Sequence, residues 1–84
     1  MDTINDKIND LNSYKSHNDL NNYAILVHSL KSDSRYLGFT KLADISLQHE
    51  LKSKANDVKY VNNNFNLLLG EIREVINIIN KYMN

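Results

Sequence analysis

The chain has 84 residues, no cysteine, no proline and a formal net charge of zero. This length allows one small domain with one core, which we expect to span residues 1–84. The absence of cysteine excludes disulfides and thiolate metal sites, and the balanced charge argues against nucleic acid as the main partner. Apolar runs are too short for a signal peptide or a membrane span, so we expect a cytoplasmic protein without membrane insertion.

A short first helix is predicted over about residues 3–14. Its N-terminus can be capped by Thr3 together with Asp6, and residues 15–18 are expected to form a loop. The predicted apolar stripe of this helix consists of Ile4, Ile8 and Leu11.

Asp19 is the predicted N-cap of a second helix, and Gly38 ends this helix as a C-cap or in a tight turn. Between them, residues recur at three- and four-residue steps that place them on one buried face. These residues are Leu20, Tyr23, Val27, Leu30, Ser34 and Leu37.

A third helix is predicted from Phe39 or Thr40 to Ala55, and Asn56-Asp57 signals a turn and a cap. Its expected buried stripe is Leu42, Ile45 and His49, with Ala43, Leu47 and Glu50 on a flank. The last helix is the longest, and its apolar stripe consists of Val58, Val61, Phe65, Leu68, Ile72, Val75, Ile79 and Met83. Residues 62–64, all asparagine, are expected to face water. Gly70 weakens this helix unless another backbone approaches it closely.

Short loops force neighbouring helices to run in opposite directions. The sequence therefore predicts an all-α fold, an antiparallel up-down-up-down four-helix bundle with a short first helix. Its two glycines, Gly38 and Gly70, are too far apart to form a glycine-rich phosphate cradle.

His28 is the residue of the second helix that points to chemistry. It lies about 100° from Val27, at the edge of the buried face. Small residues one turn away leave the imidazole open, Lys31 supplies a cation, and Ile25 offers an apolar contact. A neutral imidazole is a competent nucleophile, but no nearby acid gives His28 a Ser-His-Asp arrangement, and no positioned nucleophile precedes it. Spacing alone leaves open that His28 is an ordinary surface residue.

The segment around His28 resembles the signature of the histidine-containing phosphotransfer (HPt) family, roughly H-x-L-K-[GS]-x-S-x-x-x-G. The matching positions are His28, Leu30, Lys31, Ser32, Ser34 and Gly38, and the likeness extends over about residues 19–83. The resemblance implies that His28 is phosphorylated on Nε2 and that Lys31 stabilises the phosphoryl group. It implies that Glu50 accepts a hydrogen bond from Nδ1 and that Gly38 permits the tight turn. The implied docking residues are Ala24, Ile25, Ser32, Arg35, Leu47 and Lys54.

By the same resemblance, the chain is a phosphoprotein of a two-component phosphorelay, a phosphocarrier without autonomous catalytic activity. Its partners would be receiver domains of response regulators or hybrid sensor kinases. The receiver would supply Mg²⁺, so we expect no cofactor and no metal on this chain, and we expect a monomer. The alternative function is a helical interaction or dimerisation module that is not phosphorylated.

Three features depart from the family pattern. Ser32 replaces the commoner glycine, the first helix is shorter than usual, and His49 stands where leucine is usual. We favour His49 as a core histidine with locally satisfied nitrogens over a pH-sensitive packing fault or a partner contact. We expect no role for His17, and the three histidines lack metal-ligand spacing.

Overall fold

The computed structural model describes residues 3–83, with side chains described for residues 6–81. The helices are α1 (Thr3–Ser16), α2 (Leu20–Leu37), α3 (Thr40–Lys54) and α4 (Val58–Met83). No strand occurs in the described part of the chain. The predicted all-α class is therefore confirmed, with four helices whose bounds lie within two residues of those expected.

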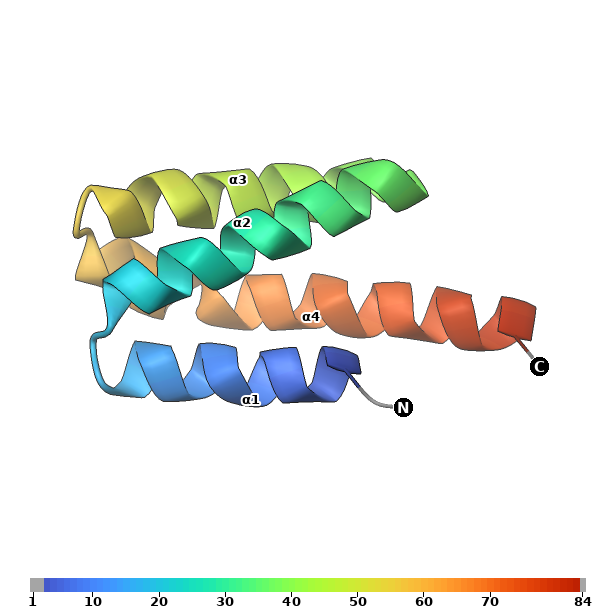
Figure 1. The fold of residues 1–84 in the computed structure, drawn as a ribbon, viewed down its shortest axis with the longest axis horizontal. Coiled ribbons are helices and arrows are strands. Elements are labelled where there is room, and N and C mark those ends of the chain that lie inside the picture. The colour runs from blue at the N-terminus through green and yellow to red at the C-terminus, as the bar shows by residue number, and fades with distance from the viewer. Residues whose placement is uncertain (1–2, 84) are drawn as a thin grey trace.

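Figure 1 shows how the helices are placed. The start of α1, the end of α4 and the turn between α2 and α3 lie at one end of the molecule, and the other two turns lie at the opposite end. The most extensive helix contact joins α2 to α3, whereas α1 has limited contact with α2 and less with α4. The molecule measures 39 × 22 × 19 Å.

The three turns share one geometry, in which a residue one or two positions after the helix end has a left-handed backbone. These residues are Asn18 (φ 54°), Gly38 (φ 86°) and Asn56 (φ 59°). After each helix, two amides bond back to carbonyls of its last turn, as Asn18 does to Lys15 and Asp19 does to Tyr14. This is the Schellman motif, which favours glycine and tolerates asparagine. Gly38 therefore forms the predicted C-cap, and α1 runs to Ser16 because Asn18 makes the turn.

Helices α2 and α4 each begin directly after an aspartate N-cap. The Asp19 carboxylate accepts a hydrogen bond from the Asn22 amide, and Asp57 accepts one from the Tyr60 amide at 3.0 Å. Both caps were predicted from the sequence. The expected cap at Thr3 and the stripe positions Ile4 and Met83 fall outside the side chains that the structure describes.

One cluster of buried apolar side chains joins all four helices. Helix α4 supplies the largest share, and all five of the predicted stripe residues from Val61 to Val75 are buried in it. Val58 and Ile79, at its ends, pack against it while partly exposed. The other members are Leu11, Leu20, Tyr23, Val27, Leu30 and Leu42.

The buried faces of α2 and α3 differ from the prediction at identifiable positions. Leu37 was expected to be buried but is 58% exposed, because it lies in the last turn of α2, at the rim of the bundle. On α3, Ile45 is only partly buried, whereas Ser46, Glu50 and Ser53 are buried. The face of α3 that meets α2 is therefore rich in small and polar residues, which an apolar stripe does not reveal.

Asn62 and Asn63 face water as predicted, whereas Asn64 is half-buried. The Asn64 side chain donates a hydrogen bond to the Tyr60 carbonyl at 3.0 Å. Gly70 is exposed, and a Cβ placed on it would meet no atom within 4 Å. No other segment therefore approaches Gly70 closely in the described part of the chain.

Candidate functional site

His28 lies near the middle of α2 with its imidazole in contact with solvent. Its side chain is 57% exposed, whereas Val27 and Leu30 on either side are buried in the core. This follows from helix geometry, because the ring leaves α2 about 100° away from the Val27 side chain. The core thus holds α2 in place while the ring stays accessible.

The carboxylate of Glu50 reaches the His28 ring from α3. Its Oε2 lies 2.8 Å from Nδ1 of His28, and the Glu50 side chain is only 4% exposed. A carboxylate that is ionised can only accept hydrogen bonds, so Nδ1 carries the hydrogen of this contact. In the neutral ring, the lone pair then lies on Nε2.

Two lysines bind the same carboxylate. Nζ of Lys31 lies 2.8 Å from Oε1 of Glu50, and Nζ of Lys54 lies 2.9 Å from Oε2. The hydrogen bonds from Lys31 and then Lys54, with a smaller contribution from His28, lower the pKa of Glu50 to about 2 against the opposing effect of burial. Glu50 is therefore a carboxylate anion near neutral pH, and it holds three side chains from two helices in one arrangement.

An open depression borders this group, lined by Asn21, Ala24, Ile25, His28, Glu50 and Lys54. Ile25 is 68% exposed at its side, which suits the docking role that the resemblance implies. Ala24, an implied docking residue, lines the depression but is itself only 5% exposed, so its small side chain leaves room beside the ring and offers little surface of its own. Asn21 was not predicted, although it stands seven residues before His28, on the same helix face.

The remaining docking residues that the resemblance implies do not all lie near His28. Ser32 and Arg35 are exposed on the face of α2 that carries His28, beyond the depression. Leu47 is partly buried and lines a separate groove beside Tyr60 and Leu67. The structure therefore gathers His28, Lys31, Glu50 and Lys54, places Ser32 and Arg35 next to them, and leaves Leu47 apart.

His49 is buried in the core, and its nitrogens are only half satisfied. Nδ1 lies 2.9 Å from the hydroxyl of Tyr23, whereas Nε2 has no hydrogen-bond partner among the described residues. Burial lowers the pKa of His49, and the backbone of Asn64 opposes this more weakly. The prediction of a core histidine is correct, but that of full local satisfaction is wrong. Sequence reasoning also missed the contact with Tyr23.

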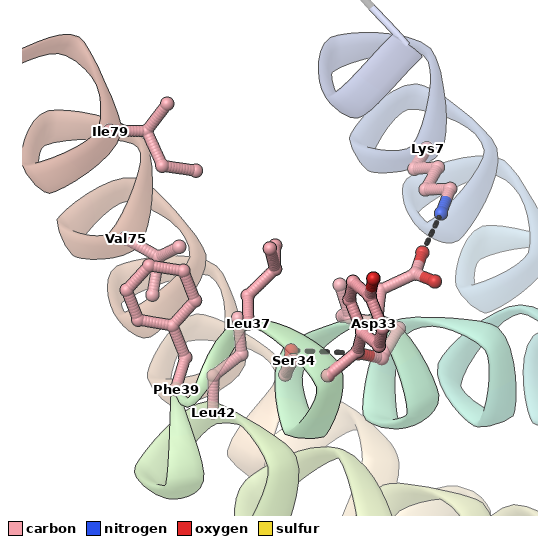
Figure 2. Close-up of a pocket in the computed structure, with 10 residues that line it drawn as sticks. Lys7, Asp33, Ser34, Leu37, Phe39, Leu42, Val75 and Ile79 are labelled. Atoms are coloured by element: carbon pink, nitrogen blue, oxygen red, sulfur yellow. Dashed lines mark hydrogen bonds and ion pairs between the residues drawn. The ribbon is translucent and has the colours of Figure 1, made fainter. Parts of the chain in front are cut away.

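A separate apolar cavity of about 240 Å³ lies toward the end of the bundle with the α2–α3 turn. Figure 2 shows Val75 and Ile79 of α4 on one side of it and the ion pair between Lys7 and Asp33 on the other. The hydroxyl of Ser34 donates a hydrogen bond to the Leu30 carbonyl at 2.7 Å. The Lys7, Asp33 and Ser34 side chains of this lining are engaged with one another or with the backbone, and no imidazole lines the cavity, so the group around His28 remains the better site for chemistry.

In the described part of the chain, no three side chains of histidine, cysteine, aspartate or glutamate gather in a way that could hold a metal ion. No helix in that part combines the length and the apolar character needed to cross a membrane.

No family model, curated protein or solved structure matches the chain. The arrangement around His28, together with the resemblance of its neighbouring residues to a known signature, is therefore the feature of the molecule that points to a function.

Proposed function

We propose that the chain is a histidine phosphotransfer domain that accepts a phosphoryl group on His28 from a receiver-domain phosphoaspartate and passes it to another receiver. One observation supports this above the others: an exposed imidazole whose Nδ1–H is bound by a buried, ionised carboxylate. In this proposal the helices form an antiparallel up-down-up-down bundle with a short first helix, and the site lies on the α2–α3 pair.

The proposed step transfers the phosphoryl group from an aspartyl oxygen to a ring nitrogen. The lone pair on Nε2 attacks phosphorus, an N–P bond forms, and the P–O bond to the aspartyl carboxylate breaks. The aspartate leaves as a carboxylate anion, while the ring becomes a phosphorylated imidazolium that keeps its Nδ1 hydrogen. Glu50 then stabilises the positive ring through the same hydrogen bond, so no proton has to move. The reverse reaction follows the same path.

In this proposal, Lys31 and Lys54 neutralise the negative charge of the incoming phosphoryl group. A phosphoryl group adds about 1.5 to 2 negative charges, and the transfer depends mainly on positioning and charge neutralisation. Both ammonium groups are already held beside the ring by Glu50. Little reorganisation is therefore required when the phosphoryl group arrives.

A receiver domain is the proposed partner, and it supplies the Mg²⁺ ion and the acidic residues of the reaction. Ile25, Ser32 and Arg35 offer it exposed apolar, small and cationic contacts around the ring. The chain itself acts as a cytoplasmic, monomeric phosphocarrier without autonomous catalytic activity.

Phosphotransfer from a panel of phosphorylated receiver domains tests this function. We expect acid-labile, base-stable label on the wild type and none on His28→Gln, which removes the nucleophile but leaves a polar side chain at an exposed position. His17→Gln is the matched control, since His17 is also exposed but lies at the end of α1. Its labelling should equal that of the wild type.

Label that persists in His28→Gln would contradict the assignment. Receiver binding without any label on the wild type would instead favour the alternative, a helical interaction module. Circular dichroism and urea unfolding of each variant show whether a loss of label reflects a loss of fold.

A further inference from the structure

The core between α2 and α3 contains a polar pair, Tyr23 and His49. The Tyr23 hydroxyl lies 2.9 Å from Nδ1 of His49, and the two residues are 0% and 1% exposed. The Tyr23 hydroxyl forms no other hydrogen bond among the described residues, and the tautomer of the His49 ring sets which of the two groups donates. This bond therefore joins α2 to α3 deep in their interface.

The pair is close to the proposed phosphorylation site along both helices. His49 directly precedes Glu50 on α3, and Tyr23 stands five residues before His28 on α2. Consecutive side chains leave a helix about 100° apart, so one rotation of α3 about its axis fixes both directions. The rotation that brings His49 to Tyr23 also aims Glu50 at His28.

The shape of the packed surfaces alone defines the rotation of α3 about its axis only weakly. The face of α3 that meets α2 contains Ala43, Ser46 and Ser53, which are all small and buried. Apolar burial is non-directional, whereas a buried hydrogen bond requires one alignment of its two partners. A single buried polar contact is known to set the register of packed helices at some loss of stability.

The structure shows the source of such a loss. Ser46 Oγ is buried without a hydrogen-bond partner in the described residues, and His49 Nε2 also lacks a partner of hydrogen-bond geometry there, although the backbone of Asn64 still acts on the ring. An unsatisfied buried polar atom lowers stability, and an apolar side chain of similar size at position 49 would avoid this penalty. A histidine is therefore not the residue that stability alone favours at this position, whereas its bond to Tyr23 gives it a directional contact with α2.

We propose that Tyr23 and His49 are positioning residues for His28: their hydrogen bond sets the rotation of α3 that brings the Glu50 carboxylate to Nδ1 of the ring. The effect on ring geometry stands independently, whereas the effect on transfer rate rests on the function proposed above.

Tyr23→Phe tests the proposal by removing one hydroxyl from the core. Nitrogen-15 NMR at about pH 8, where imidazole is mainly neutral, reports which nitrogen of His28 carries the hydrogen. We expect the wild type to hold it on Nδ1 and Tyr23→Phe to shift toward the tautomer mixture of a free imidazole. Transfer from a phosphorylated receiver should slow by roughly three- to tenfold, the size expected for one hydrogen bond.

Tyr60→Phe is the matched control. The Tyr60 ring packs edge-on against His49, with ring centroids 5.6 Å apart, but its hydroxyl forms no described hydrogen bond to His49. Removing this hydroxyl should leave the His28 tautomer and the transfer rate unchanged.

The double variant Tyr23→Phe with His49→Leu separates alignment from stability. The double variant removes both hydrogen-bonding partners, so neither is left buried without the other. Its urea midpoint should therefore be higher than that of Tyr23→Phe. The tautomer shift should remain, because the directional contact is still missing. A wild-type tautomer in either variant would overturn the proposal. If the wild type accepts no phosphoryl group, the phosphotransfer function fails, and the NMR result still decides the positioning role.

Discussion

At the scale of single residues, Glu50 connects the site to the stability of the fold. Its buried carboxylate binds Lys31, Lys54 and His28 at once. Removing the negative charge would leave Lys31, whose side chain is only 13% exposed, without an ionic partner. We therefore expect Glu50→Gln to destabilise the protein by about 1–3 kcal/mol at neutral pH, as measured by urea unfolding.

The lowered pKa values of His49 and Glu50 predict that acid destabilises the protein in two steps. Between the lowered folded pKa of His49 and its ordinary value of 6.5, only the unfolded state binds the proton, so stability falls below about pH 6.5. Glu50 adds a second loss between its ordinary pKa of 4.5 and its folded value of about 2. Urea unfolding at a series of pH values measures both losses.

Two variants show which residue causes each of the two losses of stability. Glu50→Gln should remove the second loss, and His49→Leu should reduce the first. The groups that face His49 are Tyr23 from α2 and Tyr60 from α4, and Glu50 follows it on α3. The other histidines, His17 and His28, remain in His49→Leu, so the difference from the wild type isolates His49. An unchanged slope above pH 5 in that variant would show that His49 does not titrate as described.

The sequence predicted individual residues unevenly. The resemblance placed Glu50 beside His28 because its motif has a fixed spacing, and the structure shows the two side chains in contact. The contact between Tyr23 and His49 joins residues 26 positions apart, and no motif or periodicity connects them. Ala24 was expected to leave the His28 ring open because it is small, but its own burial depends on tertiary packing, which helix spacing does not give.

At the scale of helices, the two glycines should respond oppositely to alanine. Gly70 lies inside α4, where its backbone is helical and an added methyl group would meet no neighbouring atom, so Gly70→Ala should stabilise the protein by about 0.5–1 kcal/mol. Gly38 has a left-handed backbone at the end of α2, so Gly38→Ala should destabilise it by about 1 kcal/mol. Urea unfolding of the pair measures both, and a loss of stability in Gly70→Ala would contradict the open space beside this residue.

Helix bounds and helix faces were not equally predictable. The bounds follow from local chemistry, since Asn18, Gly38 and Asn56 permit left-handed turns and Asp19 and Asp57 cap the next helices. The buried face of α4 follows from its regular apolar stripe. The face of α3 could not be predicted in the same way, because Ser46, Glu50 and Ser53 are buried by tertiary contacts that override their polarity.

At the scale of the whole molecule, one core explains why the fold class could be predicted. Every helix contributes to the same buried cluster, from Leu11 in α1 to Val75 in α4. An 84-residue chain has no room for a second core, so four amphipathic helices with short turns leave few other arrangements. The cavity beside Lys7 was beyond prediction, because it depends on how far α1 and α4 separate at one end.

The sharing of one carboxylate by Lys31 and Lys54 gives a neutral molecule an uneven electric field. The chain has no formal net charge, yet two ammonium groups and one carboxylate beside His28 leave a surplus positive charge, and the exposed Arg35 adds to it. Such a face attracts an acidic surface over a distance of about 8 Å at physiological salt. If the partner is the proposed receiver and its docking surface is acidic, association should slow as salt is added, and less so for Lys54→Gln. Stopped-flow association rates that do not change with salt would contradict this. Diffusion itself would then favour encounters in which the partner arrives at the His28 face.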